Sequence, residues 1–479
     1  MKLAKSKNYT PRKPSIGISL IPIVSVFVFL LLALIKYDID IQIPLIAASI
    51  VAALISSLVL KNKWEDIEKG MIASITNAMQ AILIACLIGL IIGSWIAGGI
   101  VPSLIYYGLK ILSPRFFLVS CLIICSLVGI STGSSWTTAG TLGVAMVGIG
   151  ISIGIPPAVT AGAVVSGAVF GDKMSPFSDT TNLAPAVSGT TLFAHIRHMI
   201  YTTGVSYIFA CVAYFFLNFK YISPDGVDNQ NISAVSSALK DNFKISPFLL
   251  LPVLFMFLII YFKLPAIPGL ICSILFGIFC SVVVQGHSIV EIGTYLSYGY
   301  SMESSNETLN ELLTKGGLQN MMWTVSLILC SLVFGGIMHQ SGMLQTIAES
   351  ILKIAKKDSS LICATGFTAI FVNLICGEQY LSLLITGNMY KDEYKKRQLA
   401  PQNLSRTLED FGTISSSLIP WTTCAVAISS YLGVSTLSYL PYAFFNLINP
   451  IVAIIFAVTG FTIKKINEVS PEDIIESVV

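Results

Sequence analysis

Hydrophobic residues occur along this chain in long runs without Asp, Glu, Lys or Arg, and the charged residues gather between the runs. Because a helix needs roughly 20 apolar residues to cross a lipid bilayer, each run predicts a membrane-spanning helix. The longest runs must hold two passes, or one pass and a re-entrant segment. The uncharged runs cover residues 16–35, 41–60, 71–109, 116–171, 199–219, 245–262, 264–286, 316–348, 359–377 and 411–463.

Composition agrees with this pattern, since 54% of the 479 residues are hydrophobic and only 11% are charged. The sequence therefore predicts an all-α polytopic membrane protein embedded in the lipid bilayer. The net charge of +3 is small, and Lys and Arg lie at loop ends, which predicts no nucleic-acid partner. The basic N-terminus runs into the first apolar run without a small-residue cleavage site, so we expect a cytoplasmic tail. The ten cysteines form no Cys-x-x-Cys pair and are expected to pack in the core.

The chain also resembles itself at a nearly constant offset. Gly99 matches Gly342 at an offset of 243 residues, and Gly133 matches Gly377 at 244. We interpret these matches as a duplication, which is frequent in secondary transporters that bind their substrate where two halves meet. The predicted division is a cytoplasmic tail at 1–14, a first transmembrane half at 15–220, an extracytoplasmic linker at 221–244, a second half at 245–465 and a cytoplasmic tail at 466–479.

Loop charge predicts how the two halves are oriented. Basic loops at 61–69, 356–357, 391–406 and 464–465 belong in the cytoplasm under the positive-inside rule, and neutral or acidic loops belong outside. Each half then crosses the membrane an odd number of times. The predicted fold is therefore two inverted-topology repeats.

Two polar segments interrupt the apolar runs of the first half. Residues 129–141 read GISTGSSWTTAGT, and residues 166–190 contain Pro176, Pro185 and Gly189 beside Asp172 and Asp179. Such segments predict broken or re-entrant helices, whose freed backbone groups are tolerated in a membrane only where they line a polar cavity. A dehydrated alkali cation requires oxygen ligands of this kind.

The second half carries acids at related places. Glu378 follows Gly377, as Ser134 follows Gly133, while Glu409 and Asp410 precede another hydroxyl-rich segment. When the two halves of the sequence are aligned, matching Asp172 with Asp410 requires a gap of about four residues.

We predict that an alkali cation binds at a carboxylate site between the halves. Structural alternatives are that Asp172 or Asp179 caps a helix or pairs with Lys173, and that Asp410 is a cytoplasmic cap. His195, Arg197 and His198 are expected to anchor a span at the membrane interface. The predicted cation and proton ligands are Asp172, Ser175, Ser178, Asp179, Thr180, Thr181, Asn182, Ser134, Ser135, Thr137, Glu378 and Asp410, with sodium at Asp172, Asp179, Thr180 and Asn182.

These segments resemble the NhaC family of sodium/proton antiporters, a branch of the ion transporter superfamily. The resemblance rests on GISTGSSWTTAGTLGVA at 129–145, GDKMSPFSDTTNLAPAVSGTTLFAHI at 171–196 and the Gly377-Glu378 segment, and it extends over essentially the whole chain. It implies exchange of sodium for protons across the bacterial cytoplasmic membrane by alternating access, without a cofactor, and it allows a homodimer. The family also includes exchangers of organic anions such as malate and lactate, and amino-acid carriers. A sodium-coupled carrier of a small carboxylate or amino acid is therefore the alternative, whereas no intramembrane enzyme motif is present.

Overall fold

The computed structural model describes residues 12–37, 39–221, 229–255, 266–304 and 307–474, and in these ranges the chain folds into helices without a named strand. In chain order the α-helices are α1 (Ile16–Leu32), α2 (Gln42–Leu54), α3 (Trp64–Asn77), α4 (Met79–Ala97), α5 (Ile100–Ile111), α6 (Phe117–Thr132), α7 (Ser135–Thr138), α8 (Val144–Ser152), α9 (Pro157–Met174), α10 (Asp179–Ser188), α11 (Leu192–Tyr221), α12 (Asn229–Asn242), α14 (Ala266–Cys280), α15 (Ile289–Tyr298), α16 (Glu307–Leu313), α17 (Leu318–Gln340), α18 (Met343–Ile354), α19 (Asp358–Cys376), α20 (Gln379–Lys396), α21 (Pro401–Thr407), α22 (Ile414–Ser416), α23 (Thr423–Leu432), α24 (Thr436–Tyr439) and α25 (Phe444–Thr459). The π-helical segments are η1 (Ala33–Tyr37), η2 (Ile55–Val59), η4 (Ala139–Gly143), η6 (Ser281–Gln285) and η7 (Leu408–Thr413).

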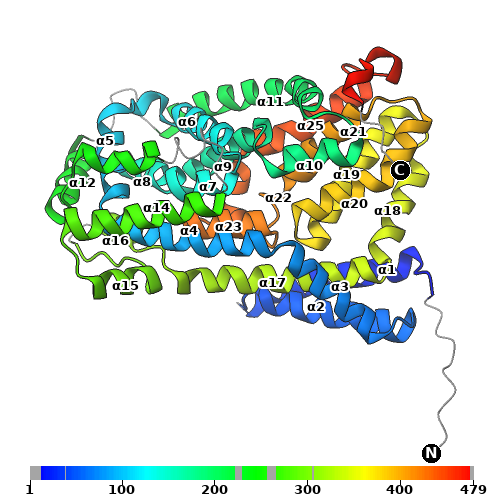
Figure 1. Cartoon of the computed structure of the whole chain (residues 1–479), viewed down its shortest axis with the longest axis horizontal. Helices are drawn as coiled ribbons and strands as arrows, with labels where there is room; N and C mark the ends of the chain where they lie inside the picture. The colour runs from blue at the N-terminus through cyan, green and yellow to red at the C-terminus, as the bar shows by residue number, and fades with distance from the viewer. Residues whose placement is uncertain (1–11, 38, 222–228, 256–265, 305–306, 475–479) are drawn as a thin grey trace, which may run out of the picture.

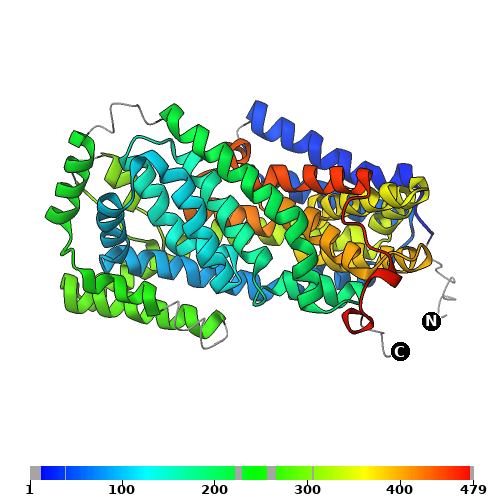
Figure 2. The same cartoon turned by 90° about the horizontal axis from the view of Figure 1, so that it is seen from above.

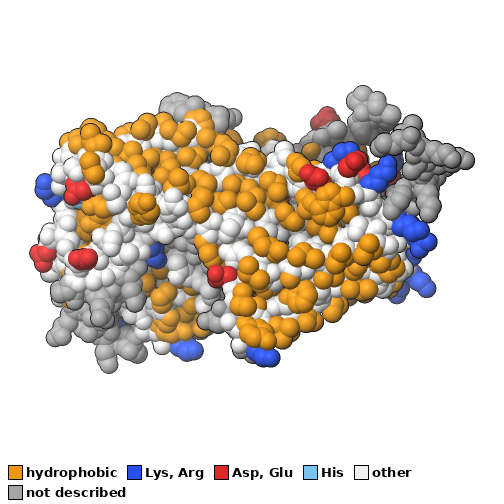
Figure 3. All heavy atoms as spheres, turned by 90° about the horizontal axis from the view of Figure 1, so that it is seen from below, with side chains coloured by type: hydrophobic (Ala, Val, Ile, Leu, Met, Phe, Trp, Pro, Cys, Tyr) orange, Lys and Arg blue, Asp and Glu red, His pale blue; other side chains and the backbone are white. Residues whose placement is uncertain are grey.

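Seven helices in the described ranges are long and apolar enough to cross a membrane. An eighth span results if Thr423–Leu432 and Thr436–Tyr442, which meet at a bend of 88°, are counted together. The longer helices lie side by side along the long axis of the molecule (Figure 1), and hydrophobic side chains cover most of the flank shown in Figure 3. The prediction of an all-α polytopic membrane protein is confirmed. Of the predicted apolar runs, 245–262 and 264–286 fall partly outside the described residues.

Helix α11 runs along much of the molecule and identifies its two ends (Figures 1 and 2). Near its start, the backbone N–H of Thr191 donates to the carbonyl of Asp473 at 3.2 Å. Near its end, Asn218 Nδ2 donates at 2.9 Å to the carbonyl oxygens of Pro114 and Arg115, where α6 begins. We call the first of these the basic end and the second the far end.

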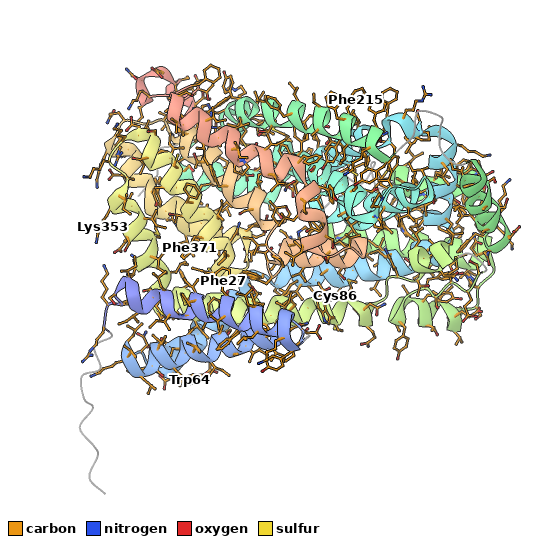
Figure 4. The ribbon with its side chains drawn as sticks, turned by 180° about the vertical axis from the view of Figure 1, so that it is seen from behind. Phe27, Trp64, Cys86, Phe215, Lys353 and Phe371 are labelled. Atoms are coloured by element: carbon orange, nitrogen blue, oxygen red, sulfur yellow. The ribbon has the colours of Figure 1, made fainter. Side chains whose placement is uncertain are left out.

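The basic end collects several of the loops that we predict to be cytoplasmic. Lys465 Nζ lies 2.8 Å from Asp358 Oδ2 at the start of α19 and also donates to the carbonyl of Arg397. Lys13 pairs with Glu349 of α18 at 2.9 Å. In Figure 4, Lys353 marks this end, while Phe215 of α11 lies toward the opposite end. The first and last described residues therefore share one end of the molecule.

Two helical hairpins enter the molecule from opposite ends. Helix α6 starts at the far end and breaks at Gly133, and the chain returns through α7, η4 and α8, which packs against α5 and α12. Helix α19 starts at the basic end and breaks at Gly377, and α20 returns until Arg397 Nη2 donates to the carbonyl of Ala355 at 2.5 Å. The predicted helix breaks are thus confirmed, while the re-entrant path of the hairpins in the membrane stays a prediction. The opposite directions are those expected of inverted repeats, which stay a prediction.

Local geometry recurs at the offset found in the sequence. Gly133 and Gly377 both end a helix in the left-handed region, with φ of 62° and 64°. A side chain at Gly133 would be strained and crowded, because its Cβ would lie 2.6 Å from the carbonyl carbon of Phe177. These matched helix ends support the predicted duplication.

The helix caps follow the same offset further along the chain. Ser178 caps α10 and Thr422 caps α23, and both helices end at a glycine with positive φ, Gly189 and Gly433. The offset of 244 residues shared by these caps matches Asp172 with Ser416. The helix caps therefore do not support the suggested equivalence of Asp172 and Asp410.

The predicted linker and C-terminal tail contain ordered structure. The linker at 221–244 includes α12, while its residues 222–228 lie outside the described ranges. Part of the tail at 466–479 packs on the protein, because Asp473 bonds to the chain before α11 and pairs with Arg197 at 3.1 Å. These contacts join residues that are at least 276 positions apart in the sequence.

Candidate functional site

The tip of the first hairpin closes against the break between α9 and α10. Asp172 is buried near the end of α9, and its Oδ2 accepts hydrogen bonds from the backbone N–H of Ser135 at 3.0 Å and from Ser135 Oγ at 2.8 Å. Ser175 Oγ donates to the carbonyl of Ile130 at 2.6 Å, and Thr181 Oγ1 donates to the carbonyl of Lys173 at 3.0 Å. A carboxylate thus lies where a hairpin tip meets a helix break.

Hydroxyl groups of the predicted site hold the broken helix ends. Ser134 Oγ accepts from the N–H of Thr137 at 3.2 Å and lies 3.1 Å from Thr137 Oγ1. Ser178 Oγ caps α10 by accepting from the N–H of Thr181, and it lies 3.1 Å from Thr180 Oγ1. Such caps satisfy backbone groups that a helix end would leave unpaired in the membrane.

Two of the predicted sodium ligands lie at the surface. Asp179 is exposed and its Oδ2 accepts a hydrogen bond from the hydroxyl of Tyr380 at 3.1 Å. Asn182 is also exposed, and its Nδ2 donates to the carbonyls of Pro176 at 2.9 Å and Ser178 at 2.7 Å. Neighbouring helical positions face different sides. The structure therefore separates these two side chains from the buried Asp172 and Thr180.

The two halves meet through reciprocal contacts. Trp136 of the first hairpin donates from Nε1 to Cys424 Sγ of the second half at 3.2 Å. Tyr380 of the second hairpin, 244 residues after Trp136, donates to Asp179 of the first half. The second hairpin also docks on its own half, where the N–H of Thr423 donates to the carbonyl of Gly377 at 2.8 Å. Both hairpin tips therefore converge on the region between the halves.

Glu378 occupies the tip of the second hairpin as a helix cap. It is buried, and its Oε2 accepts from the backbone N–H groups of Tyr380 at 2.6 Å and Leu381 at 3.1 Å. A helix N-terminus stabilises a negative charge placed there. Tyr380 lies within electrostatic reach of the buried Asp172 and Glu378 and also contacts Asp179 at the surface, so this tyrosine is near all three acids.

Asp410 forms a buried ion pair. Its Oδ1 lies 2.5 Å from Lys173 Nζ, with the two side chains 1% and 0% exposed, and its Oδ2 lies 3.9 Å from Arg406 Nε. Thr202 Oγ1 and Asn449 Nδ2 also donate to Oδ1, at 3.0 and 2.9 Å. Two cations already neutralise this carboxylate, so the structure gives no support to its predicted role as a cation ligand. The suggested pairing of Lys173 with Asp172 or Asp179 is likewise replaced by its pairing with Asp410.

Glu409 is the acid that the predicted ligand set omits. Its side chain is fully buried, and neither carboxylate oxygen has a hydrogen-bond partner among the described residues. Thr180 and Thr413 flank it, and Asp172 and Lys173 are within electrostatic reach. It lies in the π-helical segment η7, and such interruptions of an α-helix often mark functional sites. The sequence signal was the pair of adjacent acids before a hydroxyl-rich run, which does not say which acid faces the site.

The two histidines expected at the membrane interface are buried instead. His195 Nδ1 lies 2.8 Å from Ser405 Oγ, and His198 Nε2 lies 3.2 Å from Asn403 Oδ1. Both contacts join α11 to α21, whose packing covers this part of α11. The prediction is therefore wrong for these two residues, whereas Arg197 is exposed as expected.

The arrangement offers oxygen ligands rather than a transition-metal centre. Within the described ranges no group of three or more His, Cys, Asp and Glu side chains could hold a metal ion. The ten cysteines are free thiols that are buried or half-buried. Carboxylates, hydroxyls and backbone carbonyls at helix breaks suit an alkali cation carried as cargo.

Comparison with known proteins decides the family of the chain. The sequence profile of the Na+/H+ antiporter family matches residues 8–181 and 167–461. The chain belongs to the Na+/H+ antiporter family. The resemblance to NhaC proteins is confirmed as well, because the Na+/H+ antiporter NhaC of Alkalihalophilus pseudofirmus is 39% identical over 455 residues, 95% of this chain and 98% of that protein.

Two further relatives of this Na+/H+ antiporter family member come from Bacillus subtilis. One is the Na+/H+ antiporter NhaC, 37% identical over 447 residues, which are 92% of this chain and 97% of that protein. The other is a malate-2H+/Na+-lactate antiporter, 34% identical over 442 residues, which are 92% and 94% of the two chains. With its apolar helices, this family member is a multi-pass membrane transporter.

Proposed function

We propose that this transporter exchanges sodium for protons at a site built around Asp172. The supporting observation is a buried carboxylate placed between the tip of a helical hairpin and a helix break, with Ser135 donating to it twice. Burial disfavours the charged form of an acid unless a cation accompanies it. Asp172 can therefore bind either a proton or sodium, and the two ions compete.

Sodium at this place would be surrounded by oxygen atoms. Ser135, Ser178, Thr180 and Thr181 are buried near the hairpin tip and the break, and they supply hydroxyls close to Asp172. We keep these as the ligand candidates nearest to Asp172. Asp179 and Asn182, which face outward, belong to the entrance of the site rather than its centre.

The placement of the hairpins supports alternating access. The tips enter from opposite ends and meet near the middle, so a relative movement of the halves would expose the site first to one side and then to the other. Transport across the bacterial cytoplasmic membrane, with the basic end and both termini in the cytoplasm, is the arrangement that the loop charges favour. A homodimer stays a prediction.

The second candidate is coupled exchange of a small organic anion, as the name of the malate-2H+/Na+-lactate antiporter describes for that relative. Such a substrate needs a cationic side chain to receive its carboxylate. Lys173, which follows Asp172 in the sequence, and Arg406 are buried and both pair with Asp410, whose single negative charge balances one of them. Because Lys173 is held in the close ion pair with Asp410, it is less available to receive a carboxylate, which favours sodium and protons as the substrates.

Everted membrane vesicles that report their internal pH with a dye test the proposal. Adding sodium should dissipate the proton gradient through the wild type but not through Asp172→Asn, while lithium and potassium define the cation preference. Asp179→Asn is the matched control, since it makes the same chemical change at the exposed acid and should cost less activity. Equal activity of Asp172→Asn and the wild type would refute the site. Dissipation on adding malate or lactate, without a response to sodium alone, would favour the second candidate.

A further inference from the structure

Glu409 is a buried acid that the protein does not pair. The side chain is 0% exposed, and both carboxylate oxygens lack a hydrogen-bond partner in the described part of the chain. The hydroxyls of Thr413 and Thr180 approach the carboxylate without completing a hydrogen bond to it, and the buried hydroxyl of Thr413 has no other partner in the described chain. Single buried polar atoms without a partner occur elsewhere in the described chain, Asp410 Oδ2 among them, but at Glu409 both oxygens of one carboxylate lack a partner, which calls for an explanation.

The nearby cations attract Glu409 but do not contact it. Lys173 Nζ lies 2.5 Å from Asp410 Oδ1, and Arg406 lies beside Asp410 Oδ2 while its Nη1 donates to Thr462 at 2.8 Å. Within the described ranges no ion pair reaches Glu409. The charged and titratable groups around it are Asp172 and Lys173 on α9, Arg406 and Asp410 on its own helical segment, and His195 of α11, which faces Lys173.

Helix geometry explains why two adjacent acids have different surroundings. Successive residues of a helix point about 100° apart. Asp410 therefore faces Lys173, Thr202 and Asn449, whereas Glu409 faces Thr180 and the neighbourhood of Asp172. The second half thus directs one neutralised acid and one unpaired acid toward the first half.

An unpaired carboxylate in a dry interior is stable only when it is protonated or when a cation lies against it. Two carboxylates that share a site cannot both stay ionised without such a cation, because each disfavours the charge of the other. Glu409 and Asp172 are within electrostatic reach of each other, and the hydroxyl of Thr180, which is close to Glu409, lies 3.1 Å from that of Ser178. This is the environment in which a hard monovalent cation and a proton exclude one another.

We propose that Glu409 is a second ion-coupling acid, which faces Asp172 from the other half and binds the same sodium or a proton. This inference rests on the proposed function and extends it, because the site then takes one acid from each half. Glu378 stabilises the tip of the second hairpin, and Asp410 holds Lys173. Loading and release of the ion thereby depend on how closely the two halves approach.

The test uses the full chain, purified and reconstituted into liposomes that contain a pH-sensitive dye, with sodium added outside. Glu409→Gln should exchange at least about tenfold more slowly than the wild type, and Glu409→Asp should recover part of the rate. Glu349→Gln, a change at a surface acid of α18 that pairs with Lys13, is the control and should keep the wild-type rate.

A stability measurement separates coupling from a structural role. In detergent without sodium, Glu409→Gln should unfold at the same temperature as the wild type or higher, because the substitution removes an unpaired buried charge. Addition of sodium should raise the unfolding temperature of the wild type but not of Glu409→Gln.

Each outcome decides a different question. Full exchange by Glu409→Gln, with Asp172→Asn inactive, overturns the role of Glu409 and leaves the proposed function standing. A lower unfolding temperature of Glu409→Gln, together with slow exchange, overturns the coupling role in favour of a structural one. A wild type that responds to no alkali cation refutes the proposed function itself.

Discussion

Replacing Asp410 by asparagine should destabilise the folded protein more than the corresponding change at the other acids of the site. Lys173 Nζ lies 2.5 Å from Asp410, both side chains are at most 1% exposed, and Arg406 is also nearly buried. Asparagine can still accept the hydrogen bonds of Thr202 and Asn449 through its Oδ1, so the change removes mainly charge. Breaking a buried ion pair by removing one partner costs about 3–5 kcal/mol, and we expect a loss of that size.

A double-mutant cycle with Lys173→Met isolates the ion pair. Lys173→Met leaves Asp410 with Arg406 and two hydrogen-bond donors, so it should cost less than Asp410→Asn, which leaves two buried cations unpaired. The double variant should lose less unfolding free energy than the two single variants added together, by at least ~1 kcal/mol. The free energy of unfolding can be measured by titrating the detergent-solubilised protein with sodium dodecyl sulfate and following tryptophan fluorescence.

Asp179→Asn serves as the control in this cycle, because the same chemical change at an exposed acid should leave the unfolding free energy close to that of the wild type. Strictly additive losses from the two single variants would refute the pairing of Lys173 with Asp410. Wild-type stability of Asp410→Asn would show that the carboxylate is not needed to neutralise the two cations.

The remaining predictions concern the hairpin tips. Ser135→Ala removes one of the two bonds to Asp172 and should raise the sodium concentration needed for half-maximal exchange by at least about tenfold, since a hydrogen bond to a charged group contributes about 1.5–3 kcal/mol. An unchanged sodium dependence would contradict this. Glu378→Ala should lower the unfolding free energy by about 1 kcal/mol, because it removes the cap of α20. Glu378→Asp should lower it less, because aspartate keeps a capping carboxylate. Equal losses in the two variants would argue against the cap. Gly133→Ala should reduce both stability and exchange, because its Cβ would meet the backbone of Phe177, and Gly17→Ala, where no atom lies within 4 Å, is the matched control.

Much of the architecture follows from local features of the sequence. A run of apolar residues predicts a span wherever it occurs, because the bilayer sets the length that must be covered. Pro, Gly and hydroxyl-rich segments predict helix breaks for an equally local reason, and the breaks at Gly133 and Gly377 occur where the sequence indicated. The motifs at 129–145 and 171–196 were sufficient to identify the family before any contact was known.

The part that each acid plays was decided only by tertiary structure. Lys173 and Asp410 are 237 residues apart in the chain, and nothing near either residue indicates their pairing. Glu409 and Asp410 are adjacent in sequence, yet the first lacks a partner in the described chain and the second has two cations. Asp179 and Asn182 lie in the most characteristic motif but face outward. Hydropathy depends on the residues within one segment, whereas the charge and burial of a side chain depend on what the other half places against it.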